Sequence, residues 1–158
     1  MPYNSEKLLA KDQASNSNLS LQKIYNDQVK DLSMNIPLLG TLENADFTSR
    51  KRSRICGSSV SVELNVFEDK IVDFRQTVRA CLLGSCSASI FARNVIGSTS
   101  DEISVLYEQV RDMLLIDDKM PEGKWDDYRI LSTARMEKSR HASILLVIEA
   151  TLSALEKR

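Results

Sequence analysis

The chain has 158 residues, of which 42% are hydrophobic and 27% charged, a size and composition that predict one globular domain with a buried core. Its formal net charge of -1 argues against a nucleic-acid-binding protein, because such proteins carry a basic excess. The apolar run 144–148 is far shorter than the ~20 residues that cross a bilayer. The N-terminal residues lack the apolar core of a signal peptide, so we expect a cytoplasmic protein with reduced cysteines.

The N-terminal part of the chain predicts a tail followed by a helix. Residues 1–18 are polar and rich in Asn and Ser, so we expect a flexible tail there and a single folded domain over 19–158. Helical periodicity begins near Ser20 and places five apolar residues on one face: Leu21, Ile24, Tyr25, Val29 and Leu32. Pro37 and Gly40 predict the end of this helix and a loop.

The basic run 50–54 precedes the strands. Its arginines and lysine fit a solvated edge strand or its turn, and the alternative is a docking site for an acidic partner.

A β-hairpin is the clearest prediction of the sequence. Four valines and leucines alternate with polar residues over 60–66, and the turn 68–70 follows. Val72, Phe74 and Val78 predict the second strand, which leads the chain to Cys81.

The stretch 79–97 turns from strand to helix at a cysteine. Cys81 falls at the predicted corner, where helix N-terminal amides and Arg79 favour the thiolate that binds metals and attacks sulfur. Small residues then predict a tightly packed helix that Gly97 ends. Cys86, among these small residues, is interpreted as a buried packing thiol.

The C-terminal part predicts two more helices. Thr99 and Glu102 have the spacing of a capping box before an apolar stripe, and we expect a loop with a short helical turn over 125–131. A last helix begins near Lys138 and has an apolar stripe through Ile144 or Leu145, Ile148, Leu152 and Leu155. The order predicts an α+β fold, in which a small antiparallel sheet of about three strands packs against helices, with a long C-terminal helix.

Three residues with soft ligand atoms are candidates for a metal site. Cys56 precedes the first strand of the hairpin and Cys81 follows the second strand, so antiparallel pairing of these strands places the two cysteines side by side. His141, the only histidine, begins the last helix and completes a set suited to zinc or to iron in a cluster. The alternative is two packing cysteines and a structural histidine, because no Cys-x-x-Cys signature is present. A Cys81–His141 nucleophile pair lacks an identified orienting group, and we expect no enzyme.

These residues resemble a known family, the iron–sulfur cluster assembly scaffolds of the NifU/IscU type, including the SufU branch. The resemblance runs from about residue 24 to 155 and rests on a Cys-Gly pair at Cys56, Cys81 with the Ser-Ala-Ser of 87–89, and Gly97. It implies a scaffold with three metal ligands, here Cys56, Cys81 and His141. It also implies iron and a transient [2Fe–2S] cluster as cargo, and a cysteine desulfurase and apo iron–sulfur proteins as partners.

The sequence departs from the family pattern at two positions. Ser58 stands where the family has an aspartate ligand, so it is the candidate fourth-ligand position. His141 stands where the family has its third cysteine, which accepts persulfide sulfur in the Isc-type branch, so Cys81, or otherwise Cys56, is the candidate acceptor here. The stretch 134–138 lacks the Leu-Pro-Pro-Val-Lys chaperone motif, so that chaperone is not a predicted partner.

These departures leave three functions open. The first is a cluster scaffold and carrier. The second is a zinc-binding accessory protein that docks on a desulfurase and relays sulfur. The third is a degenerate interaction module without metal.

Overall fold

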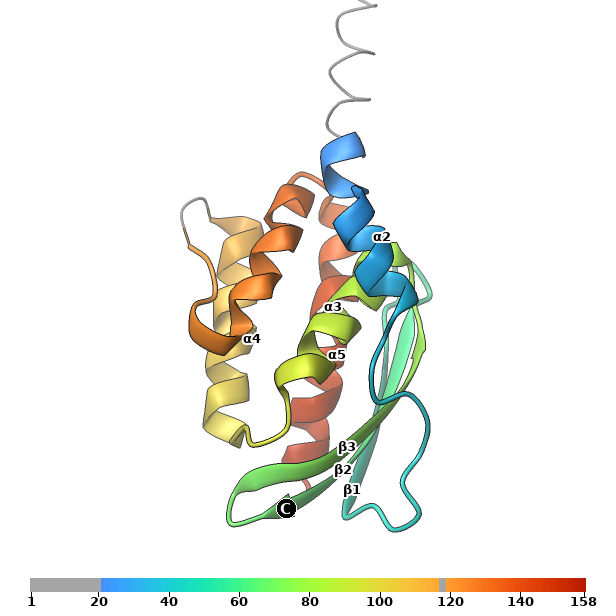
Figure 1. Cartoon of the computed structure of the whole chain (residues 1–158), viewed down its shortest axis with the longest axis vertical. Helices are drawn as coiled ribbons and strands as arrows, with labels where there is room; N and C mark the ends of the chain where they lie inside the picture. Colours follow the sequence, from blue (N-terminus) through green and yellow to red (C-terminus); the bar gives the residue numbers. More distant parts are fainter. Residues whose placement is uncertain (1–20, 117–118) are drawn as a thin grey trace, which may run out of the picture.

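A computed structural model describes residues 21–116 and 119–158 (Figure 1). The proposed tail over 1–18 lies outside the described residues. The elements are α2 (Asp27–Met34), β1 (Phe47–Arg52), β2 (Ser59–Phe67), β3 (Lys70–Arg79), α3 (Leu82–Asn94), α4 (Ser100–Leu115), the 3-10 helices η1 (Gly123–Ala134) and η2 (Lys138–Arg140), and α5 (His141–Leu155). The α+β prediction is confirmed: helices pack against one side of a three-stranded antiparallel sheet, and α5 ends the fold (Figure 1).

The predicted hairpin is β2 and β3, and β1 pairs with the other side of β2. Residues 50–52 therefore lie on an edge strand, as one interpretation of the basic run holds. The second strand is present, but of the three alternating residues that predicted it Val72 is 50% exposed, and Ile71 is buried instead. The reason is a register shift: Asn65 pairs with Asp73 and Val66 with Ile71, so Val72 is left without a partner in β2.

The N-terminal helix is interrupted where one continuous helix was predicted. Residues 21–24 are helical, and α2 starts anew after Asn26, whose side chain accepts a hydrogen bond from the Val29 amide at 3.0 Å. Asn26 is thus an N-cap, which favours a new helix start over continuation. Ile24, before the break, and Val29 and Leu32, after it, are buried as the predicted face requires, whereas Leu21 is 44% exposed.

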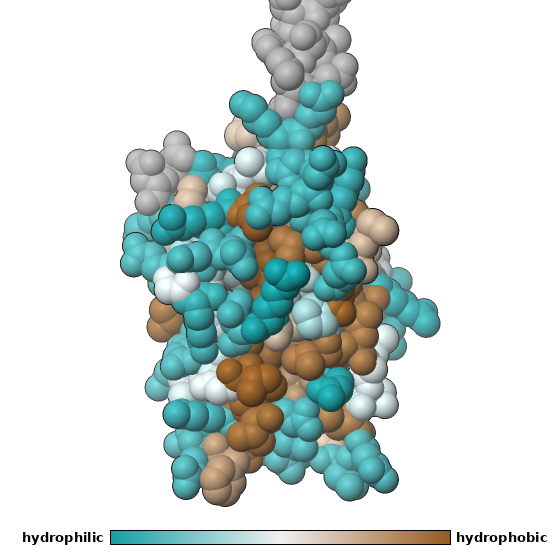
Figure 2. Space-filling model, in the orientation of Figure 1, coloured by the Kyte–Doolittle hydropathy of each residue, from teal (hydrophilic) through white to brown (hydrophobic). Residues whose placement is uncertain are grey.

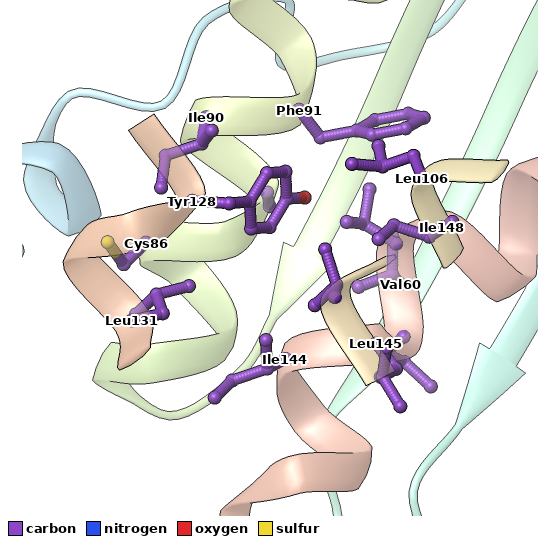
Figure 3. Close-up of a cluster of buried hydrophobic side chains, with 14 of the residues drawn as sticks. Val60, Cys86, Ile90, Phe91, Leu106, Tyr128, Leu131, Ile144, Leu145 and Ile148 are labelled. Carbon is purple, nitrogen blue, oxygen red and sulfur yellow. The ribbon is translucent and has the colours of Figure 1, made fainter. Parts of the chain in front are cut away.

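The core gathers around α5, which contacts α3, α4, β1 and β2. A single apolar stripe was predicted for α5, but ten residues of this helix are buried, and they lie on nearly all of its sides. Figure 3 shows Ile144, Leu145 and Ile148 of this helix meeting Tyr128 and Phe91 in one cluster. A helix covered by both a sheet and other helices needs apolar residues all round.

The predicted short turn over 125–131 is a longer 3-10 helix, η1. Its buried residues recur every third position, at Trp125, Tyr128, Leu131 and Ala134. A 3-10 helix has three residues per turn, so this spacing aligns them on one face against the core. Trp125 stacks on Phe91 of α3, with ring centroids 5.6 Å apart.

Other local predictions are confirmed. Thr99 and Glu102 form the capping box of α4, and Gly97 has a φ of +87° after the end of α3. Cys86 is fully buried, and burial raises the pKa of its thiol to about 12. In the face drawn in Figure 2, hydrophobic residues form a band over the centre and lower part, and hydrophilic residues surround it. Across residues 21–116 and 119–158, no helix has the length and apolar character to span a bilayer.

Candidate metal and sulfur site

The first candidate thiol lies in the six-residue connection between β1 and β2. Ser53 and Ser58 close this loop, since the Ser53 amide donates to the Ser58 carbonyl at 2.8 Å and the Gly57 amide donates to the Ser53 carbonyl at 3.0 Å. Gly57 has a φ of +72°, a conformation that favours glycine. The loop holds Cys56 partly exposed at the end of the sheet.

The second candidate thiol, Cys81, is the N-cap residue of α3, at the corner that the sequence predicts. Its backbone amide donates to the Ser58 hydroxyl at 3.3 Å, and its thiol makes no capping hydrogen bond to the helix. Ser59, the first residue of β2, pairs with Arg79, the last residue of β3. The loop that precedes β2 and carries Cys56 therefore lies beside Cys81, which follows β3. Both thiols are partly exposed and free.

A buried serine of α5 joins the two thiol-bearing segments. The Ser143 hydroxyl donates to the Ser58 hydroxyl at 3.2 Å and lies 3.2 Å from the Cys81 sulfur. The Ser58 hydroxyl in turn lies 3.2 Å from the Cys56 sulfur. Ser58 and Ser143 are 3% and 1% exposed, so a buried pair of hydroxyls links the two thiols.

Ser143 reaches this position because α3 carries a glycine opposite it. A Cβ atom at Gly84 would lie 2.2 Å from the Ser143 hydroxyl oxygen and 3.0 Å from the Cβ of Ala80. Only a residue without a side chain allows the two helices to approach this closely. Our sequence interpretation did not identify Ser143, and no local pattern around it signals its role.

The serines around Cys56 favour its thiolate. Burial alone would raise the pKa of this thiol, but hydrogen bonds with Ser53, Ser58 and Ser143 outweigh it and lower the pKa to about 7. The Cys56 sulfur lies 3.3 Å from the Ser53 hydroxyl. Near neutral pH a large fraction of Cys56 is therefore the form that binds metals and attacks sulfur.

His141 is the first residue of α5, as predicted, and its ring is anchored to the end of η1. The Nε2 atom lies 3.1 Å from the carbonyl oxygen of Ala134 and 2.9 Å from that of Arg135. Both partners are acceptors, so Nε2 carries the hydrogen, and in the neutral ring the lone pair is on Nδ1. Such a carbonyl contact typically orients a histidine that binds metal through its other nitrogen.

The residues of the predicted ligand set are only partly brought together. Hydrogen bonds connect Cys56, Cys81 and the candidate ligand Ser58, whereas His141 forms its hydrogen bonds with backbone carbonyls of another segment. Within the part of the chain that the structure describes, no group of three or more His, Cys, Asp or Glu side chains is arranged to hold a metal ion. The assembled site is two thiols among hydroxyls.

The Ser-Ala-Ser of 87–89 is a structural element beside this site. The Ser87 hydroxyl donates to the carbonyl of Ile144 at 2.6 Å and lies 3.1 Å from the hydroxyl of Tyr128. The Ser89 hydroxyl donates to the carbonyl of Asn35 at 3.3 Å. These bonds join α3 to α5, η1 and the end of α2, and so fix the helix whose first residue follows Cys81.

Comparisons with known proteins agree with this architecture. No family model matches the chain. The crystal structure of a NifU-like protein (N-terminal) from Brucella abortus superposes with a TM-score of 0.85 at 34% identity, covering 87% of this chain and 96% of that one. The curated iron–sulfur cluster assembly scaffold protein IscU of Thermotoga maritima is 22% identical over 134 residues, which are 85% of this chain and 94% of the relative.

A second solved structure has the same fold. It is described as a scaffold protein of the SUF system from Fervidobacterium islandicum, and it superposes with a TM-score of 0.77 at 22% identity, covering 85% of this chain and 98% of that one. The first structural neighbour combines 34% identity with coverage of 87% of this chain and 96% of that one. The chain therefore belongs to the NifU/IscU-type family of iron–sulfur cluster assembly scaffold proteins.

Proposed function

We propose that this protein is a scaffold and carrier that binds iron and a transient [2Fe–2S] cluster as cargo, and that it is not an enzyme. Its sulfur would come from a cysteine desulfurase, and its cluster would pass to apo iron–sulfur proteins. The observation that carries the proposal is the pair of partly exposed thiols, Cys56 and Cys81, connected through Ser58 and Ser143 in a chain of this family.

Each residue has a role in this proposal. Cys56 and Cys81 are the thiolate ligands, and the hydroxyl pair Ser58–Ser143 sets their separation. His141 is the third ligand through Nδ1, with its Nε2 hydrogen held by the two carbonyls. Histidine in place of a thiolate makes a cluster less negative and raises its potential. Ser58 marks the fourth position, which a partner or solvent would fill.

A second candidate is sulfur relay without cluster assembly, with zinc as the alternative metal. It is favoured by the surroundings of the two thiols, whose side-chain hydrogen-bond partners are the hydroxyl groups of Ser53, Ser58 and Ser143. In this role a thiolate of Cys81, or of Cys56, attacks the outer sulfur of the desulfurase persulfide. A new S–S bond forms, the old S–S bond breaks, and the desulfurase cysteine leaves as a thiolate.

Elemental analysis of protein purified anaerobically from its own host tests these candidates. Iron and acid-labile sulfide in equal amounts support the scaffold, and zinc alone supports the relay. Protein without metal and without persulfide would refute both and favour an interaction module.

Variants then assign the ligands. Cys56→Ser, Cys81→Ser and His141→Ala should each lower metal affinity, since each removes a ligand atom. Cys86→Ala is the matched control, because it removes the remaining thiol, which is fully buried. Unchanged affinity in the first three variants would refute the site.

A further inference from the structure

The outer face of the sheet carries a basic surface at the end nearest the two thiols. In the antiparallel register Arg52, Ser59 and Arg79 lie side by side, and Arg50, Ser61 and Thr77 form the next row. Directly paired residues share a face, and this face is opposite to that of the buried Val60 and Val62. We call these six residues the arginine face.

The arginine face is free to bind a partner. All three arginines are exposed, and none forms an ion pair with any residue in 21–116 or 119–158. A pocket of about 210 Å³ lies on this face, lined by Arg50, Arg79 and the three hydroxyl residues Ser59, Ser61 and Thr77. Guanidinium groups and hydroxyls can all donate hydrogen bonds, and no carboxylate lines this pocket. Such a set suits carboxylate or phosphate oxygens.

Acidic side chains appear only farther along the sheet. Glu63 lies in the third row and is already engaged, since its carboxylate accepts the amide of Leu42 at 2.7 Å. Asp73 pairs with Arg75 at 3.2 Å. The positive charge is therefore concentrated on the end of the sheet from which the Cys56 loop and Cys81 continue.

The position and extent of the arginine face favour a protein partner. Arg52 immediately precedes the loop that carries Cys56, and Arg79 lies two residues before Cys81. Ile55, in the same loop, is 71% exposed and adds an apolar contact beside the charges. A single phosphate would fill the pocket between Arg50 and Arg79 and leave Arg52 unpaired, whereas a segment with several carboxylates would reach all three.

We propose that the arginine face binds a carboxylate-rich segment of the protein that exchanges sulfur or cluster with Cys56 and Cys81. This inference rests on the proposed function, because it assigns the charge of the partner that the site would meet. Alternate residues of a strand lie ~6.7 Å apart, so Arg50 and Arg52 match the spacing of alternate acidic side chains in an extended segment. Neighbouring strands lie ~4.8 Å apart, so Arg79, two strands from Arg52, lies ~9.6 Å from it and needs a further carboxylate.

Titration of the ¹⁵N-labelled full chain with a hexaglutamate peptide tests the binding surface. We expect amide shifts concentrated at 50–52, 59–61 and 77–79, and about tenfold weaker binding by the double variant Arg50→Glu/Arg79→Glu. The matched control is Arg129→Glu, an exposed arginine of η1, which should bind the peptide as the wild type does. Shifts elsewhere, or equal loss in the control, would overturn the proposal.

Two competing ligands extend the test. Inorganic phosphate that saturates the same amides at a lower concentration than hexaglutamate would assign a small-anion site instead. A thymidylate 12-mer that binds more tightly than hexaglutamate would assign a nucleic acid. Either result overturns the proposal.

Sulfur transfer from the cysteine desulfurase of the same organism connects the surface to the thiols. We expect hexaglutamate to slow persulfide formation on the wild type and to leave the rate of the double variant unchanged. Peptide binding without any effect on transfer would overturn the docking role. A wild type that accepts neither sulfur nor metal would instead refute the proposed function, while the peptide titration would stand unaffected.

Discussion

The Ser143 hydroxyl on α5 lies 3.2 Å from the Cys81 sulfur at the start of α3, although the two residues are 62 positions apart. The same hydroxyl donates to Ser58 at the start of β2. One buried serine near the start of α5 thus connects the start of α3 with the start of β2. The position of Cys81 relative to the Cys56 loop therefore includes a contact from a residue far away in the sequence.

Ser143→Ala should loosen this arrangement. The variant removes two hydrogen bonds of the hydroxyl, which together are worth about 1–3 kcal/mol of folding free energy. We expect a lower unfolding midpoint in urea and faster alkylation of Cys81. Ser153→Ala, on the same helix outside the site, is the control. Unchanged stability and alkylation in Ser143→Ala would contradict the linking role.

Gly84→Ala should destabilise the fold through the same contact. The added methyl group would meet the Ser143 hydroxyl at 2.2 Å, so this hydroxyl must turn away from Ser58 and Cys81 or α3 and α5 must move apart, at a cost of about 1–3 kcal/mol. Combining it with Ser143→Ala should recover part of this loss, because the hydroxyl oxygen is the nearest obstacle. A double-mutant cycle by chemical denaturation measures the coupling, and strictly additive effects would be evidence against it.

The reactivity of Cys56 should rise steeply across neutral pH. Its pKa of about 7 lies below the ordinary thiol value, so the thiolate fraction rises between about pH 6 and pH 8 and is nearly complete by about pH 8.5. Iodoacetamide labelling of the Cys81→Ser/Cys86→Ala variant isolates this thiol. Adding Ser53→Ala should move the midpoint to higher pH, since that serine contacts the sulfur at 3.3 Å. If the Cys81→Ser/Cys86→Ala variant with Ser53 intact showed a labelling midpoint at the ordinary thiol pKa, the proposed effect of the serines would be refuted.

Ser58→Asp should slow the loss of bound metal to a chelator, because a carboxylate is a better ligand than a neutral hydroxyl. The position is only 3% exposed, so the metal-free variant should be less stable than the wild type, by roughly 1–3 kcal/mol. Ser58→Asn has nearly the same shape without the charge and should not slow the loss. Equal release rates in all three proteins would mean that the fourth ligand comes from elsewhere.

The sequence predicted the parts of this fold whose causes are local. The alternation around Val62 specified β2, and Thr99 with Glu102 specified the start of α4. Cys81 was placed correctly at a helix start because a strand pattern changes to a helical one there. These signals lie within a few residues of the feature that they predict.

The parts that the sequence did not predict depend on contacts between distant segments. The repeat of Trp125, Tyr128, Leu131 and Ala134 is visible in the sequence, but a period of three over this length is rare and is supported by burial against Phe91 and α5. Ser143 acquires its role only from the close approach at Gly84. For the same reason, spacing alone gave no indication that the His141 ring is anchored to backbone carbonyls of η1.

The two thiols are supported in unequal ways. Cys81 is the N-cap residue of a helix that buried serines fix to its neighbours, whereas Cys56 lies in a short loop that turns at Gly57. Cargo bound to both thiols would be held by one ligand on a fixed helix, Cys81, and by one ligand on a loop, Cys56. We therefore expect cargo release to begin at Cys56, because a rearrangement confined to residues 53–58 leaves α3 and the core in place.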